Sequence, residues 1–157
     1  MNITVICVGK IKEKYFTDAI NEYKKRMSRF CKLEIIEIPD EKIPDKASEK
    51  EMTAIKNKEG KGILSKLKNG YVISMCIEGT ELSSEKLAER IENTAMQSSD
   101  ITFIIGGSLG LSDEVKSRSD LRLSFGRITL PHQLMRVVLC EQIYRAFKIN
   151  HNESYHK

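Results

Sequence analysis

The chain has 157 residues and a mass of 17.9 kDa, which is the size of one ordinary domain. Its 40% hydrophobic and 31% charged residues exclude a disordered, collagen-like or low-complexity protein. The formal net charge is +4, and no stretch approaches the roughly 20 apolar residues of a membrane span. The start of the chain has no basic segment of the kind that opens an export signal. We therefore expect one cytoplasmic domain, residues 1–157, with no membrane partner.

The first part of the chain alternates strand-like apolar runs with a helical pattern. Ile3–Val8 is predicted as a strand because most of its residues are apolar and several are β-branched. Apolar residues then recur every three or four positions, which predicts a helix over residues 16–30. They are Phe16, Ile20, Tyr23, Met27 and Phe30. A second strand, Leu33–Ile38, ends at Pro39 and is followed by a polar loop.

A second helix is expected from Ser48 toward Lys68. Ser48 and Glu51 have the spacing of a capping box, which marks a helix N-terminus. Gly60 and Gly62 lower the helix propensity of this segment.

Strands and helices continue to alternate through the second half. The predicted elements are a strand at Tyr71–Ile77, a helix capped by Ser83 or Ser84, a strand at Ile101–Ile105, a short helix at Ser112–Arg118 and a strand at Leu121–Phe125. This repeat predicts an α/β fold with a mostly parallel sheet of five to six strands, flanked by helices. Apolar runs without strict polar alternation fit strands that are covered on both faces.

The last predicted helix, His132–Ile149, lacks a wide polar face. Eleven of its 18 residues are apolar. A helix that is apolar nearly all round must be covered on more than one side. Because the sheet can cover only one side, we expect a homodimer built around this helix. Burial by the C-terminal tail is the alternative, although little chain remains to provide it.

The four cysteines favour buried, reduced thiols. Cys7, Cys31, Cys76 and Cys140 lie far apart, and none belongs to a C-x-x-C pair or has histidines at ligand spacing. We expect no metal site. His151 and His156 in the tail have no third ligand near them in the sequence.

Positive charge gathers in the first half of the chain. Residues 1–70 hold 16 Lys and Arg against 11 Asp and Glu, and eight of these basic residues lie within Lys10–Lys32. Such a patch could follow a phosphate backbone. A solvated helix face is the ordinary alternative, and charge alone favours it.

Three predicted strand ends carry candidate binding residues. One strand is followed by Gly106-Gly107-Ser108-Leu109-Gly110, where glycines would let backbone amides approach a ligand closely. The spacing matches neither the dinucleotide fingerprint nor the phosphate-binding P-loop, and a glycine-rich turn is often only a turn. The segment from Ser124 to His132 could wrap a flat heterocycle or serve as a plain connection. The third strand end runs from Met75 to Gly79.

The start of the last helix holds the best candidates for chemistry. His132 and Arg136 are one turn apart and share a helix face. A helix N-terminus disfavours the cationic form of His132, which suits a neutral base or hydrogen-bonding group. Glu141 and Arg145 have the spacing of a helix ion pair.

Several of these segments together resemble a known family. They are Ile105-Gly106-Gly107-Ser108-Leu109-Gly110-Leu111, Leu123-Ser124-Phe125, Leu130-Pro131-His132-Gln133, Arg136-Val137, Glu141-Gln142-Ile143-Tyr144-Arg145-Ala146 and the ending Tyr155-His156-Lys157. The pattern resembles the large-subunit ribosomal RNA methyltransferase H family, single-domain members of the SPOUT or α/β-knot methyltransferases. The resemblance covers the whole chain and is most specific in the C-terminal half.

The resemblance implies a fold, a cofactor and a substrate. The C-terminal segment would form a trefoil knot, a rare exception to unknotted topology. The cofactor would be S-adenosylmethionine, bound bent in the knot against Met75, Gly106, Phe125, Gly126, Arg127, Ile128, Thr129 and Leu130. The family acts as a homodimer. Its substrate is the assembled 70S ribosome, where it methylates N3 of a pseudouridine in a hairpin loop of 23S ribosomal RNA.

The resemblance also suggests roles for side chains. His132 and Arg136 would act near the transferred methyl group, with Tyr155 and His156 closing over the site from the tail. Lys24, Lys25 and Arg26, together with Arg145, would hold the RNA. Two other classes stay open: a nucleotide-binding doubly wound domain without methyl transfer, and a non-catalytic ribosome-binding factor.

Overall fold

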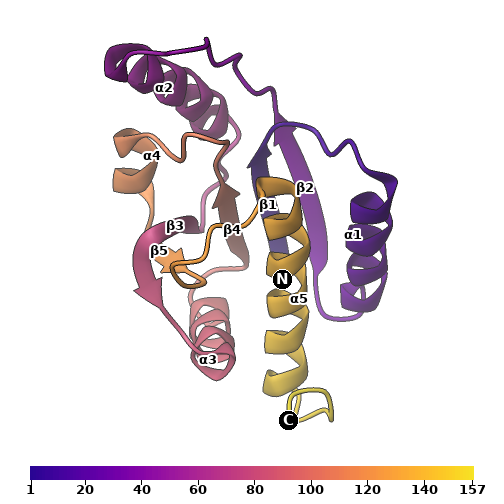
Figure 1. Cartoon of the computed structure of the whole chain (residues 1–157). Coiled ribbons are helices and arrows are strands. Elements are labelled where there is room, and N and C mark those ends of the chain that lie inside the picture. Colours follow the sequence, from indigo (N-terminus) through magenta and orange to yellow (C-terminus); the bar gives the residue numbers. More distant parts are fainter.

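The computed structural model describes residues 1–157 as five strands and five helices that alternate along the chain (Figure 1). The strands are β1 (Asn2–Val8), β2 (Lys32–Ile38), β3 (Tyr71–Glu81), β4 (Asp100–Ile105) and β5 (Leu121–Ser124). The helices are α1 (Lys14–Met27), α2 (Glu49–Ser65), α3 (Ser84–Ala95), α4 (Asp113–Arg118) and α5 (His132–Asn150). The predicted α/β class and the predicted order of elements are both confirmed. No helix is long and apolar enough to cross a membrane.

The sheet is entirely parallel and has the strand order β2-β1-β4-β3-β5. From β1 the chain crosses to β2 on one side, whereas from β4 it crosses to β5 on the other side of the sheet. The strand order therefore reverses between β1 and β4. In open α/β sheets, ligands bind beyond the carboxyl ends of the strands at such a switch point.

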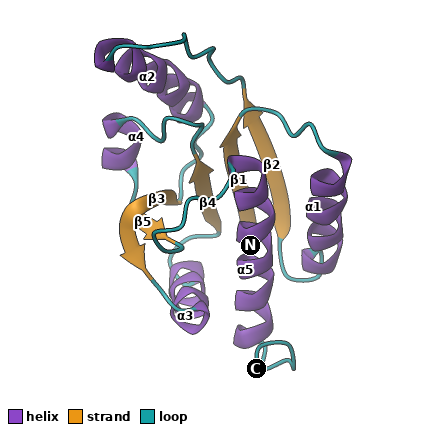
Figure 2. Ribbon diagram, in the orientation of Figure 1, coloured by secondary structure: helices purple, strands orange, loops and turns teal.

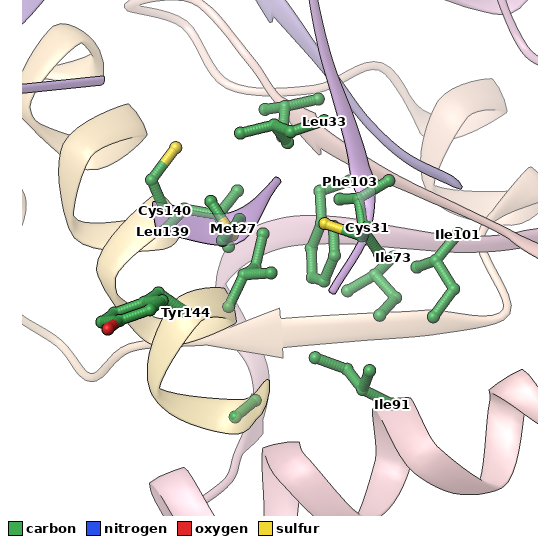
Figure 3. Packing of buried hydrophobic residues seen from close by; sticks show 14 of the residues in the cluster. Met27, Cys31, Leu33, Ile73, Ile91, Ile101, Phe103, Leu139, Cys140 and Tyr144 are labelled. Atoms are coloured by element: carbon green, nitrogen blue, oxygen red, sulfur yellow. The ribbon is translucent and has the colours of Figure 1, made fainter. Parts of the chain in front are cut away.

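Helices cover both faces of the sheet (Figures 1 and 2). Alternate residues of β1 point to opposite sides: Ile3, Val5 and Cys7 belong to the larger apolar cluster, while Ile6 and Val8 belong to the smaller one. The larger cluster, shown in Figure 3, packs the sheet against α1, α3 and α5. The smaller cluster packs it against α2 and α4.

The N-caps lie where the sequence predicts them. The hydroxyl of Ser48 accepts a hydrogen bond from the backbone N–H of Glu51, and the Glu51 carboxylate accepts one from the Ser48 N–H, which completes the capping box. Ser83 caps α3 in the same way, through the N–H of Lys86. Ser112 caps α4 and is not its first residue.

The main departure from prediction is β3, which continues to Glu81 and does not end at Ile77. Its pairing with β5 shifts register between Met75 and Thr80, and Thr80 then pairs with the same Leu123 as Met75. The irregularity therefore lies at the carboxyl end of the strand, next to the site described below. The first helix is also displaced, since it begins at Lys14 and ends at Met27.

All four cysteines are free and buried, as predicted. Burial raises the pKa of Cys7 and of Cys140 to about 12 in each case. These thiols therefore stay protonated at neutral pH and act as small apolar side chains.

Gly60 explains how α2 packs against α4. A Cβ at this position would lie 2.4 Å from the hydroxyl oxygen of Ser112 and 3.3 Å from a methyl group of Val115. Ser112 cannot rotate away freely, because its hydroxyl caps α4 by accepting from the N–H of Val115. The glycine that weakens the helix locally thus permits close contact between two helices.

We expect Gly60→Ala to destabilise the protein by about 1–3 kcal/mol, although alanine has the higher helix propensity. Urea unfolding measures the difference. Asn57→Ala, at an exposed position of the same helix, is the matched control and should stay within about 0.5 kcal/mol of the parent protein. A stabilised Gly60→Ala variant would contradict the proposed close packing.

Candidate active site

A cavity of about 800 Å³ lies at the carboxyl ends of β3, β4 and β5. Most of its wall comes from three segments that are far apart in the sequence. They are the end of β3 (Met75, Cys76, Ile77, Glu78), the turn after β4 (residues 105–111) and the connection from β5 into α5 (Leu123–Gly126, Ile128–His132 and Met135). The predicted strand-end segments therefore meet at one place, next to the switch point of the sheet.

The turn after β4 depends on its glycines. Gly110 donates its N–H to the carbonyl of Gly107 at 3.0 Å and has a φ of +84°, in the left-handed region that favours glycine. A Cβ on Gly106 would lie only 3.0 Å from the backbone of Gly110. A Cβ on Gly110 would have no atom within 4 Å, so this backbone borders open space.

Ser124 fixes the connection that follows β5. Its hydroxyl donates to the carbonyl of Ile77 at 2.9 Å and accepts from the N–H of Gly126 at 3.1 Å. Gly126 has a φ of +107° and also borders open space. Ile128, at the rim of the cavity, is 81% exposed.

Most residues predicted to bind the cofactor line this cavity. They are Met75, Gly106, Phe125, Gly126, Ile128, Thr129 and Leu130. Arg127 does not line it.

His132 is the first residue of α5 and lies at the boundary between two cavities. It lines the large cavity and a smaller one of about 200 Å³ beside the end of β1. Burial lowers the pKa of His132, and the nearby positive charge of Arg136 lowers it further, while Asp40 acts in the opposite direction. The ring is therefore mainly neutral at pH 7, as its helix position predicted.

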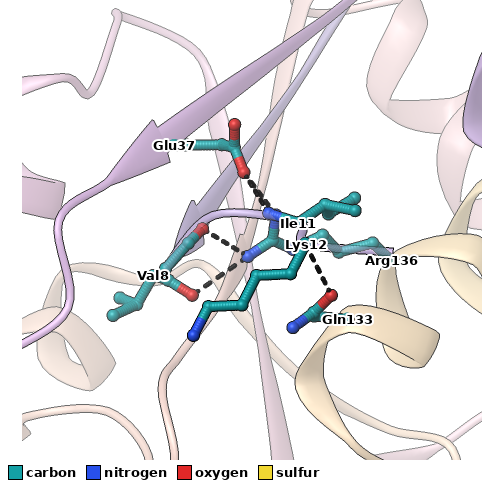
Figure 4. A network of polar contacts seen from close by, with 7 residues as sticks. Val8, Ile11, Lys12, Glu37, Gln133 and Arg136 are labelled. Carbon is teal, nitrogen blue, oxygen red and sulfur yellow. Dashed lines mark hydrogen bonds and ion pairs between the residues drawn. The ribbon is translucent and has the colours of Figure 1, made fainter. Parts of the chain in front are cut away.

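Arg136 does not line either cavity. Its side chain is fully buried, with 0% exposure, and points to the end of β1 (Figure 4). It donates to the carbonyls of Val8 and Gly9 at 3.0 and 2.6 Å and to the carboxylate of Glu37 at 2.9 Å. The predicted role of Arg136 near the methyl group does not fit this orientation, because both terminal nitrogens of the guanidinium are used in holding β1, β2 and α5 together.

The tail residues lie against the second half of α5. The hydroxyl of Tyr155 donates to Glu141 at 2.7 Å, and the Arg145 guanidinium lies 4.7 Å from the centre of the Tyr155 ring. His156 contacts Arg145 at 3.2 Å and Glu85 at 2.7 Å. Glu141 and Arg145 come nine and 13 residues after His132 in α5, which places them about 14 and 20 Å along the helix from it. One chain therefore does not bring Tyr155 and His156 to His132.

The predicted RNA-binding residues lie beside this tail. Lys24, Lys25 and Arg26 form the exposed last turn of α1. Arg26 pairs with Glu22, and its guanidinium lies 5.9 Å from the centre of the Tyr144 ring on α5. Arg145 pairs with Glu141 within the helix, as its spacing predicted.

The sequence analysis missed several charged residues at the cavities. Lys56 of α2 and the ion pair between Lys116 and Glu78 line the large cavity. Glu59 of α2 lines the small one and is only 6% exposed. Gly60 was the available signal, because a glycine inside a helix often marks a face packed closely on another segment.

We expect an NMR pH titration of the His132 ring to give a pKa below the usual value near 6.5. Asp40→Asn removes the one charge that favours the imidazolium and should lower the pKa further. Asp45→Asn, in the same loop, should leave it unchanged. A His132 pKa at or above 6.5 would contradict the buried environment described above.

Comparisons with known proteins agree with this architecture. A family model described as "Predicted SPOUT methyltransferase" matches residues 1–156. Ribosomal RNA large subunit methyltransferase H 1 of Clostridium perfringens (strain SM101 / Type A) is 64% identical, and the H protein of Clostridioides difficile (strain 630) is 60% identical, each over 100% of both chains. A solved structure, of a probable methylase family protein from Haemophilus influenzae Rd KW20, has a similar fold. Its TM-score is 0.55 at 12% identity, over 99% of this chain and 70% of that one. The chain belongs to the SPOUT methyltransferase family.

Proposed function

We propose that this protein transfers a methyl group from S-adenosylmethionine to N3 of a pseudouridine in 23S ribosomal RNA of the assembled ribosome. The observation that carries the proposal is full-length identity of 60–64% to proteins named ribosomal RNA large subunit methyltransferase H. The family and the position of the cavity support the same chemistry. Pseudouridine as the target base and N3 as the target atom come from the resemblance of the C-terminal motifs to this family.

The large cavity fits the cofactor. Its volume of about 800 Å³ is within the range of small-molecule sites. At Gly110 and Gly126 a flat ring could approach the backbone, since no atom lies within 4 Å of a Cβ built there. The apolar side chains of Met75, Phe125 and Leu130 would cover an adenine, with backbone groups of the connection supplying its hydrogen bonds.

His132 is the residue best placed to handle the proton. S-adenosylmethionine supplies an electrophilic methyl group on a sulfonium. N3 of pseudouridine is a weakly acidic imide, so it must lose its proton as the new N–C bond forms and the sulfur keeps the electrons of the broken S–C bond. The mainly neutral ring of His132 can accept that proton as a general base. Holding N3 in line with the methyl carbon would supply much of the remaining rate enhancement.

Arg136 is a positioning residue in this scheme. Its bonds to Val8, Gly9 and Glu37 fix the first turn of α5, and His132 lies one turn earlier on the same helix face. The guanidinium also lowers the pKa of His132 through its charge. Both effects act through His132 and need no contact with the substrate.

A homodimer would complete the site. Leu134 and Val138, one turn apart on α5, are partly exposed and belong to neither apolar cluster. A second copy of α5 packed antiparallel on this ridge, about a two-fold axis, would bury it. The partner's tail would then lie near the His132 end of this helix. Tyr155 and His156 would thus serve the cavity of the other subunit.

The same pairing would bring positive charge to the substrate. Lys24, Lys25 and Arg26 lie on the last turn of α1, next to the tail. In the dimer these residues and Arg145 would border the partner's cavity and contact RNA phosphates.

Labelled methyl transfer from S-adenosylmethionine to ribosomes from a strain that lacks this gene tests the proposal. We expect label in intact ribosomes, at a single pseudouridine, and little in free RNA or isolated subunits. His132→Ala should lower the rate by about 10²–10⁴-fold, the usual contribution of a general base. Its affinity for S-adenosylhomocysteine should stay close to that of the parent protein.

Two results would contradict the proposal. Absence of label from a folded protein, beside an active control methyltransferase, would favour a non-catalytic ribosome-binding factor. Unchanged turnover of His132→Ala would remove the base from the scheme.

Mixing two inactive variants tests the shared site. In a dimer that combines His132→Ala with Tyr155→Phe, one cavity has both an intact His132 and an intact partner tail. We expect the random mixture to recover about one quarter of the parent activity, since half of the dimers are mixed and half of their sites are intact. If each chain served its own cavity, the mixture would stay as inactive as its components.

A further inference from the structure

Two charged residues of α2 line the cavities without an oppositely charged partner. Lys56 lines the large cavity, is half-buried and has no carboxylate within 4.0 Å. Glu59 lines the small cavity and is 6% exposed, yet only one bond reaches its carboxylate, from the backbone N–H of Glu41 to Oε2 at 3.1 Å. No group of the chain donates to Oε1. Burial raises the pKa of Glu59 and the negative charges of Asp40 and Glu41 raise it further, while the N–H of Glu41 acts in the opposite direction.

The two side chains belong to one arrangement. Residues three apart on a helix are neighbours on its surface, with Cβ atoms about 5–6 Å apart. Both cavities share the wall formed by Gly107, Ser108 and Leu109. The Glu59 carboxylate packs directly on Gly107, where a built Cβ would lie 3.3 Å from Oε1. A ligand in the large cavity that extends past this turn would therefore meet Lys56 and Glu59 together.

A cation beside an anion at this spacing matches a zwitterion. An α-amino acid carries a carboxylate and an ammonium group on one carbon. Lys56 could pair with the carboxylate and Glu59 with the ammonium group. The other basic group in the large cavity is committed, because Lys116 forms an ion pair with Glu78 at 2.6 Å. The large cavity is also lined by Phe125, Leu130 and Pro131 of the connection into α5, which supply apolar surface.

We propose that Lys56 and Glu59 bind the amino-acid end of the cofactor, Lys56 its carboxylate and Glu59 its ammonium group. This inference rests on the proposed function. It assigns α2 a part in cofactor binding, although α2 lies outside the C-terminal segment that forms most of the large cavity. Because hydrogen bonds to charged groups contribute more than neutral ones, loss of either contact should weaken binding by about tenfold or more.

Calorimetric titration of the purified protein with three ligands tests the assignment. S-adenosylhomocysteine has both charged groups, its decarboxylated form keeps only the ammonium, and 5′-methylthioadenosine has neither. Lys56→Met should weaken S-adenosylhomocysteine about tenfold and leave the other two ligands within twofold. Glu59→Gln should weaken S-adenosylhomocysteine and the decarboxylated form, and leave 5′-methylthioadenosine within twofold.

The matched controls are Lys61→Met and Glu49→Gln, at exposed positions of the same helix. Neither should change any of the three affinities. Unchanged binding of 5′-methylthioadenosine shows in each variant that the cavity is still folded. Equal weakening of all three ligands, or no weakening of S-adenosylhomocysteine, would overturn the assignment. Failure of the parent protein to bind any of the three would instead contradict the proposed function.

Discussion

The buried guanidinium of Arg136 is the interaction on which the site depends. It joins the last helix to the carbonyls at the end of the first strand and to Glu37 at the end of the second. Its Nε has no partner, so the three bonds made by the terminal nitrogens must offset the desolvation of a full charge. Removal of one member of such a buried pair typically costs about 3–5 kcal/mol. The same contacts set the position of His132, which begins α5 at the boundary of the two cavities.

The order of the strands explains why the site lies there. Because β1 and β4 lead to opposite sides of the sheet, no crossing segment covers their carboxyl ends. Gly9, with a φ of +87°, lets the chain turn away from β1 directly beside the ring of His132, whose Nε2 would lie 3.6 Å from a Cβ at that position. Gly106 and Gly110 make the matching turn after β4. The hollow between the two turns is therefore a consequence of the topology, and the glycines keep it open.

The sequence predicted local features well and long-range ones poorly, for physical reasons. Apolar runs and serine caps act over a few residues, so the strands, the capping box at Ser48 and the cap at Ser83 could be located directly. The role of Arg136 could not be found in this way, because its partners Val8 and Glu37 are 128 and 99 residues away. Lys56 and Glu59 were missed because α2 reaches the cavity through long-range packing, such as that of Gly60 on Ser112. The extension of β3 depends on its irregular pairing with β5, and this pairing leaves no recognisable pattern in the sequence of β3 itself. The predicted knot still rests on the resemblance alone.

In the proposed function, residues at different positions along α5 serve proton transfer and RNA binding. One end holds His132, near the cavity and far from the basic turn of α1. The second half of the helix holds Arg145 and, through Glu141, Tyr155 of the tail. At about 14–20 Å along the helix from His132, these residues would leave a lone chain to bind cofactor and RNA at separate places. In the proposed dimer, antiparallel pairing along Leu134 and Val138 would remove this separation, because the RNA-binding residues of each subunit would then lie over its partner's cavity. The apolar character of α5 along most of its circumference, visible in the sequence, is the feature that would make catalysis a property of the dimer.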